Sequence, residues 1–308
     1  MKNYEVIKAV NVSKKYGDTD ALKNINLTIN SGEIYGLIGN NGAGKTTFLK
    51  MLTGQCTPSE GQISMFGQTG EQELNKARRR QGAIIETPSF YPKMTVKHNL
   101  EYYRIQRGIP EKDSVKRVLK EVGLLDAGNK KAEDLSLGMK QRLGLALALM
   151  GDPELLILDE PINGLDPTGI VEIRNLLLKL NREKNITILI SSHILTELSH
   201  IATCYGFLRK GVLVEQDTAK GLQEKCSTYI EVKISNAHKY TALLETDLDC
   251  TEYKVMPDQS VRIFDLSHPI EEYSTLAVTN GMGLQGIQEK KIDLESYYME
   301  LVGGEENA

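Results

Sequence analysis

Residues 39–47 read GNNGAGKTT, which contains the complete pattern G-x-x-x-x-G-K-[ST] of a phosphate-binding loop. The short apolar run EIYGLI at 33–38 precedes this loop, and the helix-compatible run TFLKML at 47–52 follows it. A strand, a glycine-rich turn and a helix in that order aim backbone amides and a helix N-terminus at a phosphate group. This context favours a phosphate site over a glycine-rich turn with a chance lysine.

The phosphate loop assigns a role to each kind of residue in it. The glycines let the backbone approach phosphate oxygens, Lys45 brings a positive charge to the β and γ phosphates, and the Thr46 hydroxyl is a candidate Mg²⁺ ligand. The residues predicted to contact the nucleotide phosphates are Gly39, Asn40, Asn41, Gly42, Ala43, Gly44, Lys45, Thr46 and Thr47. This loop alone leaves kinases, GTPases and several ATPase classes open. A GTPase is disfavoured, because no Asn-Lys pair continues into the guanine-reading NKxD element.

A second motif, LLILDEP at 155–161, places two acids at the end of an apolar run. In parallel sheets the carboxyl ends of the strands are where ligands bind. We therefore predict that Asp159 ligates Mg²⁺ and that Glu160 is the general base for the attacking water. The alternative is a strand end with two solvated acids, which the phosphate loop upstream makes less favourable.

The distribution of apolar residues predicts an α/β fold. The runs at 33–38, 155–158 and 186–190 suit strands that are buried on both faces, as in a mainly parallel sheet covered by helices. Between 94 and 150 the sequence becomes charged and helix-periodic; Val115, Val118, Leu119 and Val122 would form one apolar face. We expect this segment to be a helical insertion into the sheet domain.

The charge of the chain is unevenly distributed and indicates two modules. The 308 residues have a formal net charge of −4, but residues 1–215 carry net +5 and residues 216–308 carry net −9. A composition of 40% hydrophobic and 25% charged residues excludes a fibrous or disordered chain. The longest uncharged stretch, 273–288, is too short and polar to span a bilayer, and no apolar signal region opens the sequence. We expect a cytoplasmic protein.

The acidic module at 216–308 has its own pattern. Its predicted elements are a strand at 229–234, a helix at 241–247, strands at 253–256 and 261–264, a helix at 270–279, a strand at 284–288 and a helix at 294–302. The order β-α-β-β-α-β plus one helix matches a ferredoxin-like split βαβ unit. We therefore expect a small α+β accessory domain.

Residues 135–142 read LSLGMKQR. Together with the phosphate loop and LLILDEP, this segment resembles the signature of ATP-binding cassette (ABC) ATPases, usually LSGGQ. The resemblance covers about residues 4–215 and implies a RecA-like core with a helical subdomain at about 94–150. Ser136 is a predicted helix N-cap, and it and Gly138 would contact phosphate at a helix N-terminus. Leu137 departs from the usual signature, as does the methionine two positions later.

The resemblance implies further site residues. Tyr16 is similar to the aromatic on which adenine stacks, a contact worth ~1–3 kcal/mol per base in nucleic-acid binders; without the family, a tyrosine packed at a strand end would be the better interpretation. Asp166 ends the segment NGLD, which resembles the loop linking two ATP sites, and His193 resembles the switch histidine that contacts the γ phosphate. The implied catalytic residues are Lys45, Glu160 and His193.

One position departs from the family. A glutamine that reaches Mg²⁺ usually follows the strand near residue 84, but this chain has Glu86. A carboxylate would bind Mg²⁺ more strongly but adds negative charge beside Asp159 and Glu160. We predict a ligand role for Glu86; the alternative is an exposed loop acid.

Glu86, the variant signature and the acidic extra domain resemble one branch of the family, the ATP-binding subunits of bacitracin-resistance and lantibiotic-immunity transporters. The resemblance implies ATP and Mg²⁺ as cofactors, a homodimer, separate membrane-spanning permease subunits that contact the cargo, and a place on the inner face of the membrane. We expect no nucleic-acid partner, because the −9 module does not suit one. A cassette that exports a lipid or drug, or a non-transport ABC ATPase, is the alternative. Ribosomal factors of this family have two cassettes and repair proteins have a long coiled coil, features not found in this sequence.

Overall fold

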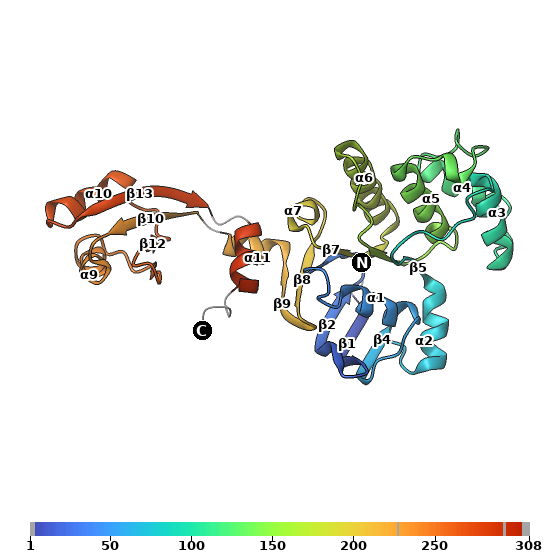
Figure 1. Cartoon of the computed structure of the whole chain (residues 1–308), viewed down its shortest axis with the longest axis horizontal. Helices are drawn as coiled ribbons and strands as arrows, with labels where there is room; N and C mark the ends of the chain where they lie inside the picture. Colours follow the sequence, from blue (N-terminus) through green and yellow to red (C-terminus); the bar gives the residue numbers. More distant parts are fainter. Residues whose placement is uncertain (1–3, 227, 292–293, 304–308) are drawn as a thin grey trace. The chain divides into compact units, whose positions relative to one another are not determined.

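The computed structural model describes residues 4–226, 228–291 and 294–303. The chain divides into two compact units, Met1–Ala219 and Lys220–Ala308, whereas the sequence pattern places the change of module between 215 and 216. Figure 1 shows the elements of both units along the chain. In the part of the chain that is described, no helix is both long and apolar enough to cross a bilayer.

The first unit is built on a six-stranded sheet with the order β5-β6-β7-β3-β8-β9. Neighbouring strands run parallel except the last pair, β8 and β9. The strands are β3 (Ile34–Ile38), β5 (Gln81–Ile84), β6 (Leu155–Asp159), β7 (Thr187–Ser192), β8 (Cys204–Arg209) and β9 (Val212–Thr218). Every residue of β3, β6 and β7 is buried, which confirms the interpretation of the three apolar runs as strands covered on both faces.

A second, antiparallel sheet with the order β2-β1-β4 completes this unit and is not expected from the parallel pattern. Its strands are β1 (Glu5–Tyr16), β2 (Thr19–Asn30) and β4 (Glu60–Met65). Their inward side chains share one hydrophobic core with residues of β3, β6 and α1 (Lys45–Thr53). The remaining helices outside the insertion are α2 (Glu71–Ala77), the 3₁₀ turn η1 (Arg78–Arg80), α6 (Pro167–Lys184) and α7 (Leu195–Leu198).

The segment from 94 to 150 is helical, as predicted, and its helices lie together at one side of the unit in Figure 1. It contains α3 (Val96–Gln106), α4 (Ser114–Glu121), the 3₁₀ turn η2 (Ala132–Asp134) and α5 (Leu137–Leu149). Val115, Val118 and Leu119 are buried on one face of α4, which confirms the apolar face read from the sequence. Helix α5 packs on β5 and also contacts α3 and α4, so it connects the insertion to the sheet.

The second unit contains a four-stranded sheet with the order β11-β12-β10-β13, in which all neighbours are antiparallel. Helix α8 (Ala219–Lys225) begins at the last residue of the first unit. The elements that follow are β10 (Thr228–Ile234), α9 (Ala237–Asp247), β11 (Tyr253–Val255), β12 (Val261–Ile263), α10 (Ile270–Thr279), β13 (Leu284–Lys291) and α11 (Leu294–Gly303). Helices α9 and α10 share a core with the sheet. Element order and strand order are those expected of a split βαβ unit.

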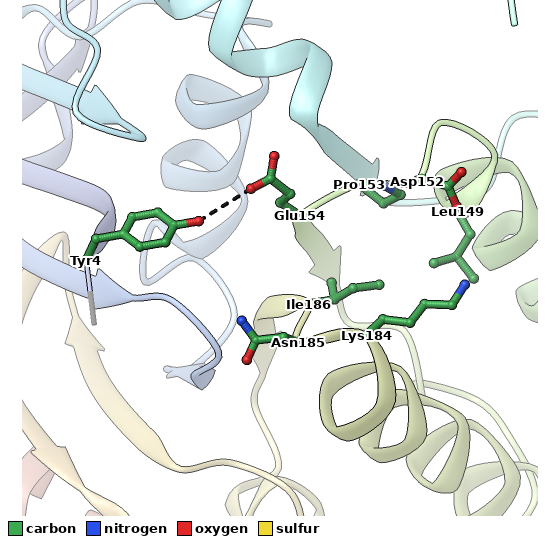
Figure 2. Close-up of a pocket in the computed structure, with 8 residues that line it drawn as sticks. All are labelled: Tyr4, Leu149, Asp152, Pro153, Glu154, Lys184, Asn185 and Ile186. Atoms are coloured by element: carbon green, nitrogen blue, oxygen red, sulfur yellow. Dashed lines mark hydrogen bonds between the residues drawn. The ribbon is translucent and has the colours of Figure 1, made fainter. Parts of the chain in front are cut away.

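A pocket of about 250 Å³ lies at the amino ends of β6 and β7 (Figure 2). The charged residues that line it pair with residues outside the lining. The Glu154 carboxylate accepts two hydrogen bonds from Arg80 at 2.7 and 2.6 Å, and the Tyr4 hydroxyl lies 3.4 Å from the same carboxylate. Because the strands are parallel, their carboxyl ends meet at the opposite edge of the sheet. The phosphate loop and both acids of LLILDEP are at that opposite edge.

Candidate active site

The phosphate loop connects β3 to α1, as the motif predicts. Gly42 and Gly44 have φ angles of 81° and 107°, a region that favours glycine. A Cβ on Gly44 would lie 2.7 Å from the Ala21 carbonyl oxygen, and one on Gly39 would lie 2.4 Å from the Leu208 carbonyl oxygen. Close backbone approaches therefore require glycine at 39 and 44, and the left-handed φ also favours glycine at 42 and 44.

Lys45, the first residue of α1, is buried and directs its ammonium back over the loop. Its Nζ donates to the Gly39 carbonyl at 2.6 Å and lies 3.2 Å from a carboxylate oxygen of Glu160. A buried cation needs such partners, because leaving water costs several kcal/mol per ion. The lysine thus links the phosphate loop to the end of β6.

A pocket of about 350 Å³ opens above the loop. It is lined by Asn40, Asn41, Gly42, Ala43, Gly44, Lys45, Thr46, Thr47, Glu160, Asn163, Thr19, Asp20 and Ala21. All predicted loop residues except Gly39 are in this lining. The segment 19–21 at the start of β2 is a part of the pocket that the sequence does not predict, because its position depends on the antiparallel sheet. No local motif in the sequence marks it.

Asp159 and Thr46, both predicted Mg²⁺ ligands, lie in direct contact. The Thr46 hydroxyl donates to Asp159 Oδ2 at 2.8 Å, and the buried Asp159 carboxylate also accepts from the Ser191 hydroxyl at 2.6 Å. Mg²⁺ prefers oxygen ligands and is usually held by one or two carboxylates together with substrate phosphates. A hydroxyl and a carboxylate beside a phosphate loop fit that ion. No cluster of three or more His, Cys, Asp or Glu side chains suited to a metal occurs in the described part of the chain.

Glu160 lies between Lys45 and His193. Its backbone has a φ of 48°, and its side chain is 22% exposed, so it reaches the pocket while staying mostly enclosed. Nδ1 of His193 is 2.7 Å from a Glu160 carboxylate oxygen. The structure therefore brings the three predicted catalytic residues into one contact chain. Nearby, burial raises the pKa of Glu197, with Glu160 adding to the shift and His193 opposing it. No sequence motif points to this acid.

Glu86 contacts a different partner from the pair formed by Asp159 and Thr46. Its side chain is 62% exposed, and its carboxylate pairs with the Lys50 ammonium at 2.6 Å. This contact is the main cause of the raised pKa of Lys50, to which the charge of Asp159 also contributes. Lys50, which offsets the charge of Glu86, was not predicted from the sequence. Among the described residues no hydrogen bond joins Glu86 to Thr46 or Asp159.

Tyr16 ends β1 with a ring that is 49% exposed. The Lys14 ammonium lies 5.0 Å from the ring centre, and a hydrogen bond with Cys56 raises the pKa of the phenol. Cys56 in turn lies 3.9 Å from the Thr47 carbonyl oxygen. The exposed ring therefore lies near Thr47, the third residue of α1, where a base attached to bound phosphates could reach it.

The signature segment and the Asp166 loop adjoin each other but do not line the pocket over the phosphate loop. Ser136 is the N-cap of α5 and accepts from the Met139 amide at 3.3 Å, as predicted. Asp166 is the N-cap of α6 and accepts from the Gly169 amide at 3.1 Å. The Leu165 side chain lies 3.9 Å from the Cβ position of Gly138. Both helix N-termini are at the surface.

Comparison with known proteins identifies the family. The family model described as "ABC transporter" matches residues 22–163. The chain is 42% identical over 299 residues to the bacitracin transport ATP-binding protein BcrA of Enterococcus faecalis, covering 97% of both chains. It belongs to the ATP-binding subunits of ABC transporters. This ABC subunit is also 40% identical over 222 residues to the lantibiotic transport ATP-binding protein SrtF of Streptococcus pyogenes, covering 71% of this chain and 95% of SrtF.

Solved structures agree with this assignment. A dimeric ATP-binding cassette in a post-hydrolysis state, bound to ADP and Pi, matches with a TM-score of 0.63 and 28% identity, covering 69% of this chain and 98% of that cassette. The ABC ATPase fold predicted from the three motifs is thereby confirmed for the first unit.

The metal role of Glu86 remains a prediction with a direct test. If Glu86 ligates Mg²⁺, replacing it by alanine removes an oxygen ligand, so Glu86→Ala should raise the Mg²⁺ concentration needed for half-maximal ATP binding several-fold. Glu86→Gln keeps one oxygen and should shift it less. Titration of Mg²⁺ against a fluorescent ATP analogue gives these midpoints. Unchanged midpoints in both variants would leave Glu86 as the ion-pair partner of Lys50.

Proposed function

We propose that this subunit binds ATP with Mg²⁺ and hydrolyses it to ADP and phosphate. The observation that carries this proposal is the contact chain from Lys45 through Glu160 to His193 beside the phosphate loop. Lys45 would neutralise charge on the terminal phosphates, and Glu160 would accept a proton from the attacking water. Mg²⁺, held by Thr46 and Asp159, would supply charge stabilisation for the phosphate oxygens.

We infer that two copies of the subunit complete each ATP site. Ser136 and Gly138 belong to a helix N-terminus, which attracts anions, yet they do not line the pocket over their own phosphate loop. A second copy could bring its α5 N-terminus to that pocket, with the Asp166 loop alongside. The dimeric state of the matched cassette supports this arrangement.

We further propose that the subunit powers export by separate transmembrane subunits and works at the inner face of the cell membrane. A groove of about 190 Å³ lies between the loop after β5 and helices α3 and α5, where Pro88, Tyr103 and Arg107 are among the lining residues. The exposed rings of Tyr91, just before the insertion, and Tyr102, on α3, contact each other edge to face. This surface would receive the membrane subunits, which would contact the cargo.

The cargo that the comparisons favour is a peptide antibiotic of the bacitracin or lantibiotic type. Support comes from the match to a bacitracin transport protein over 97% of both chains, which includes the second unit, and from the 222-residue match to a lantibiotic transport protein. Removal of the antibiotic from the membrane would protect the cell. Export of a lipid or another drug is the competing proposal, because membrane subunits choose the cargo.

Hydrolysis can be tested by removing the proposed base. Glu160→Gln preserves the size of the side chain but cannot accept the proton, so ATP binding should persist while turnover falls about 10²–10⁴-fold. Phosphate release and ATP-analogue binding by the purified subunit measure the two effects. Glu183→Gln, which changes an exposed acid on α6, is the matched control. Near-normal turnover in Glu160→Gln would contradict the assignment of the base.

Cargo can be tested in cells that express the subunit together with its membrane partners. Cells with the wild-type subunit should survive higher concentrations of bacitracin, or of a lantibiotic, than cells with Glu160→Gln. Unrelated drugs and membrane-active lipids serve as the comparison compounds. If the two strains tolerate both peptide classes equally but differ in tolerance to another compound, the peptide cargo is contradicted and that compound becomes the proposed cargo.

A further inference from the structure

Ser191 is a buried polar residue that touches both acids of the site. It is fully buried, it lies on β7, and it is directly opposite Asp159 in the parallel pairing of β6 with β7. Its Oγ donates a hydrogen bond to Asp159 Oδ1 at 2.6 Å and accepts one from the Glu160 amide at 3.0 Å. The Ser191 hydroxyl thus donates to Asp159 and accepts from Glu160, the next residue in the sequence.

The bond to Asp159 restricts the proposed metal ligand from one side. The second oxygen of this carboxylate accepts from the Thr46 hydroxyl at 2.8 Å. With one hydroxyl on each oxygen, rotation of the carboxylate about its Cβ–Cγ bond would break at least one bond. Ser191 therefore contributes to the direction in which Asp159 presents its remaining lone pairs.

The bond to the Glu160 amide restricts the proposed base. Glu160 has a φ of 48°, in the left-handed region that residues other than glycine rarely adopt. Its amide also lies 3.3 Å from the Ser191 carbonyl oxygen. The Glu160 N–H group therefore donates to both the carbonyl oxygen and the hydroxyl oxygen of Ser191. This backbone conformation directs the Glu160 carboxylate toward Lys45 and His193.

We propose that Ser191 is a positioning residue that fixes the metal-binding carboxylate of Asp159 and the water-activating carboxylate of Glu160 relative to each other. This inference rests on the proposed hydrolysis of ATP. Serine suits the position because its hydroxyl donates and accepts at once, whereas alanine can do neither and a thiol forms only weak hydrogen bonds.

The adjacent serine offers a matched control. Ser192 is equally buried, but its hydroxyl exchanges hydrogen bonds with the backbone of Ile194 at 2.9 and 3.2 Å. It forms part of the same strand end without a hydrogen bond to either acid in the described contacts. A general loss of packing or polarity at the end of β7 would affect both serines alike.

The test compares Ser191→Ala and Ser192→Ala in the full-length subunit. Misplacement of reacting groups by ~1 Å can cost ~10²-fold in rate, so turnover of Ser191→Ala should fall about 10–100-fold. The gain in ATP-analogue affinity on adding Mg²⁺ should also shrink several-fold, while affinity without Mg²⁺ stays unchanged. Ser192→Ala should retain both properties. Ser191→Cys, which keeps the side-chain volume, should show the same losses as Ser191→Ala and serves if the alanine variant does not fold.

Two results would overturn the proposal. The first is an unchanged Mg²⁺-dependent affinity gain and unchanged turnover in Ser191→Ala. The second is an equal loss in both serine variants, which would indicate a structural role. If the wild-type subunit does not release phosphate, the proposed function fails, but the Mg²⁺-dependent affinity still decides whether Ser191 positions Asp159.

Discussion

Parallel pairing of β3 with β7, and of β7 with β6, is the constraint on which the site depends. It places the carboxyl ends of three buried strands side by side, so that residues far apart in the sequence emerge at one edge. The phosphate loop follows β3, Asp159 and Glu160 end β6, and His193 follows β7. Hydrogen bonds and the buried ion pair of Lys45 then connect these three strand ends. A shift of register in either pairing would separate the groups by several ångströms.

The second unit has its own hydrophobic core, and two buried tyrosine hydroxyls in it donate to backbone carbonyls. The Tyr240 hydroxyl donates to the Tyr273 carbonyl at 2.9 Å, and the Tyr273 hydroxyl donates to the Asp265 carbonyl at 2.7 Å. Burial raises the pKa of Tyr273 to about 12, so both rings stay neutral and keep their protons for these bonds. This unit has the more acidic composition. The match of the chain to the bacitracin transport protein covers 97% of both proteins and so includes this unit.

Much of the site could be predicted from sequence because its residues belong to short local motifs. Thr46 belongs to the phosphate loop that follows one apolar run, and Asp159 and Glu160 end another. Both runs suit buried strands, and the carboxyl ends of parallel strands meet at one edge of the sheet. The antiparallel sheet could not be predicted in the same way, since β1, β2 and β4 pair through contacts that no local pattern marks. The roles of Ser191 and Lys50 could not be predicted for the same reason. Each role depends on a partner residue that is distant in the sequence and adjacent only in the fold. For Glu86, the resemblance predicts a metal ligand, and the fold adds an ion pair with Lys50 that the sequence does not predict.

The central claim is that two copies of this chain close on ATP and hydrolyse it. The rate of phosphate release per chain, followed over a wide range of protein concentration at saturating ATP and Mg²⁺, tests it most directly. We expect Mg²⁺-dependent release whose rate per chain rises with protein concentration and then levels off, because in the proposed dimer Ser136 and Asp166 of one copy would complete the site of the other. Absence of phosphate release, or a rate per chain that does not change with concentration down to high dilution, would contradict this account.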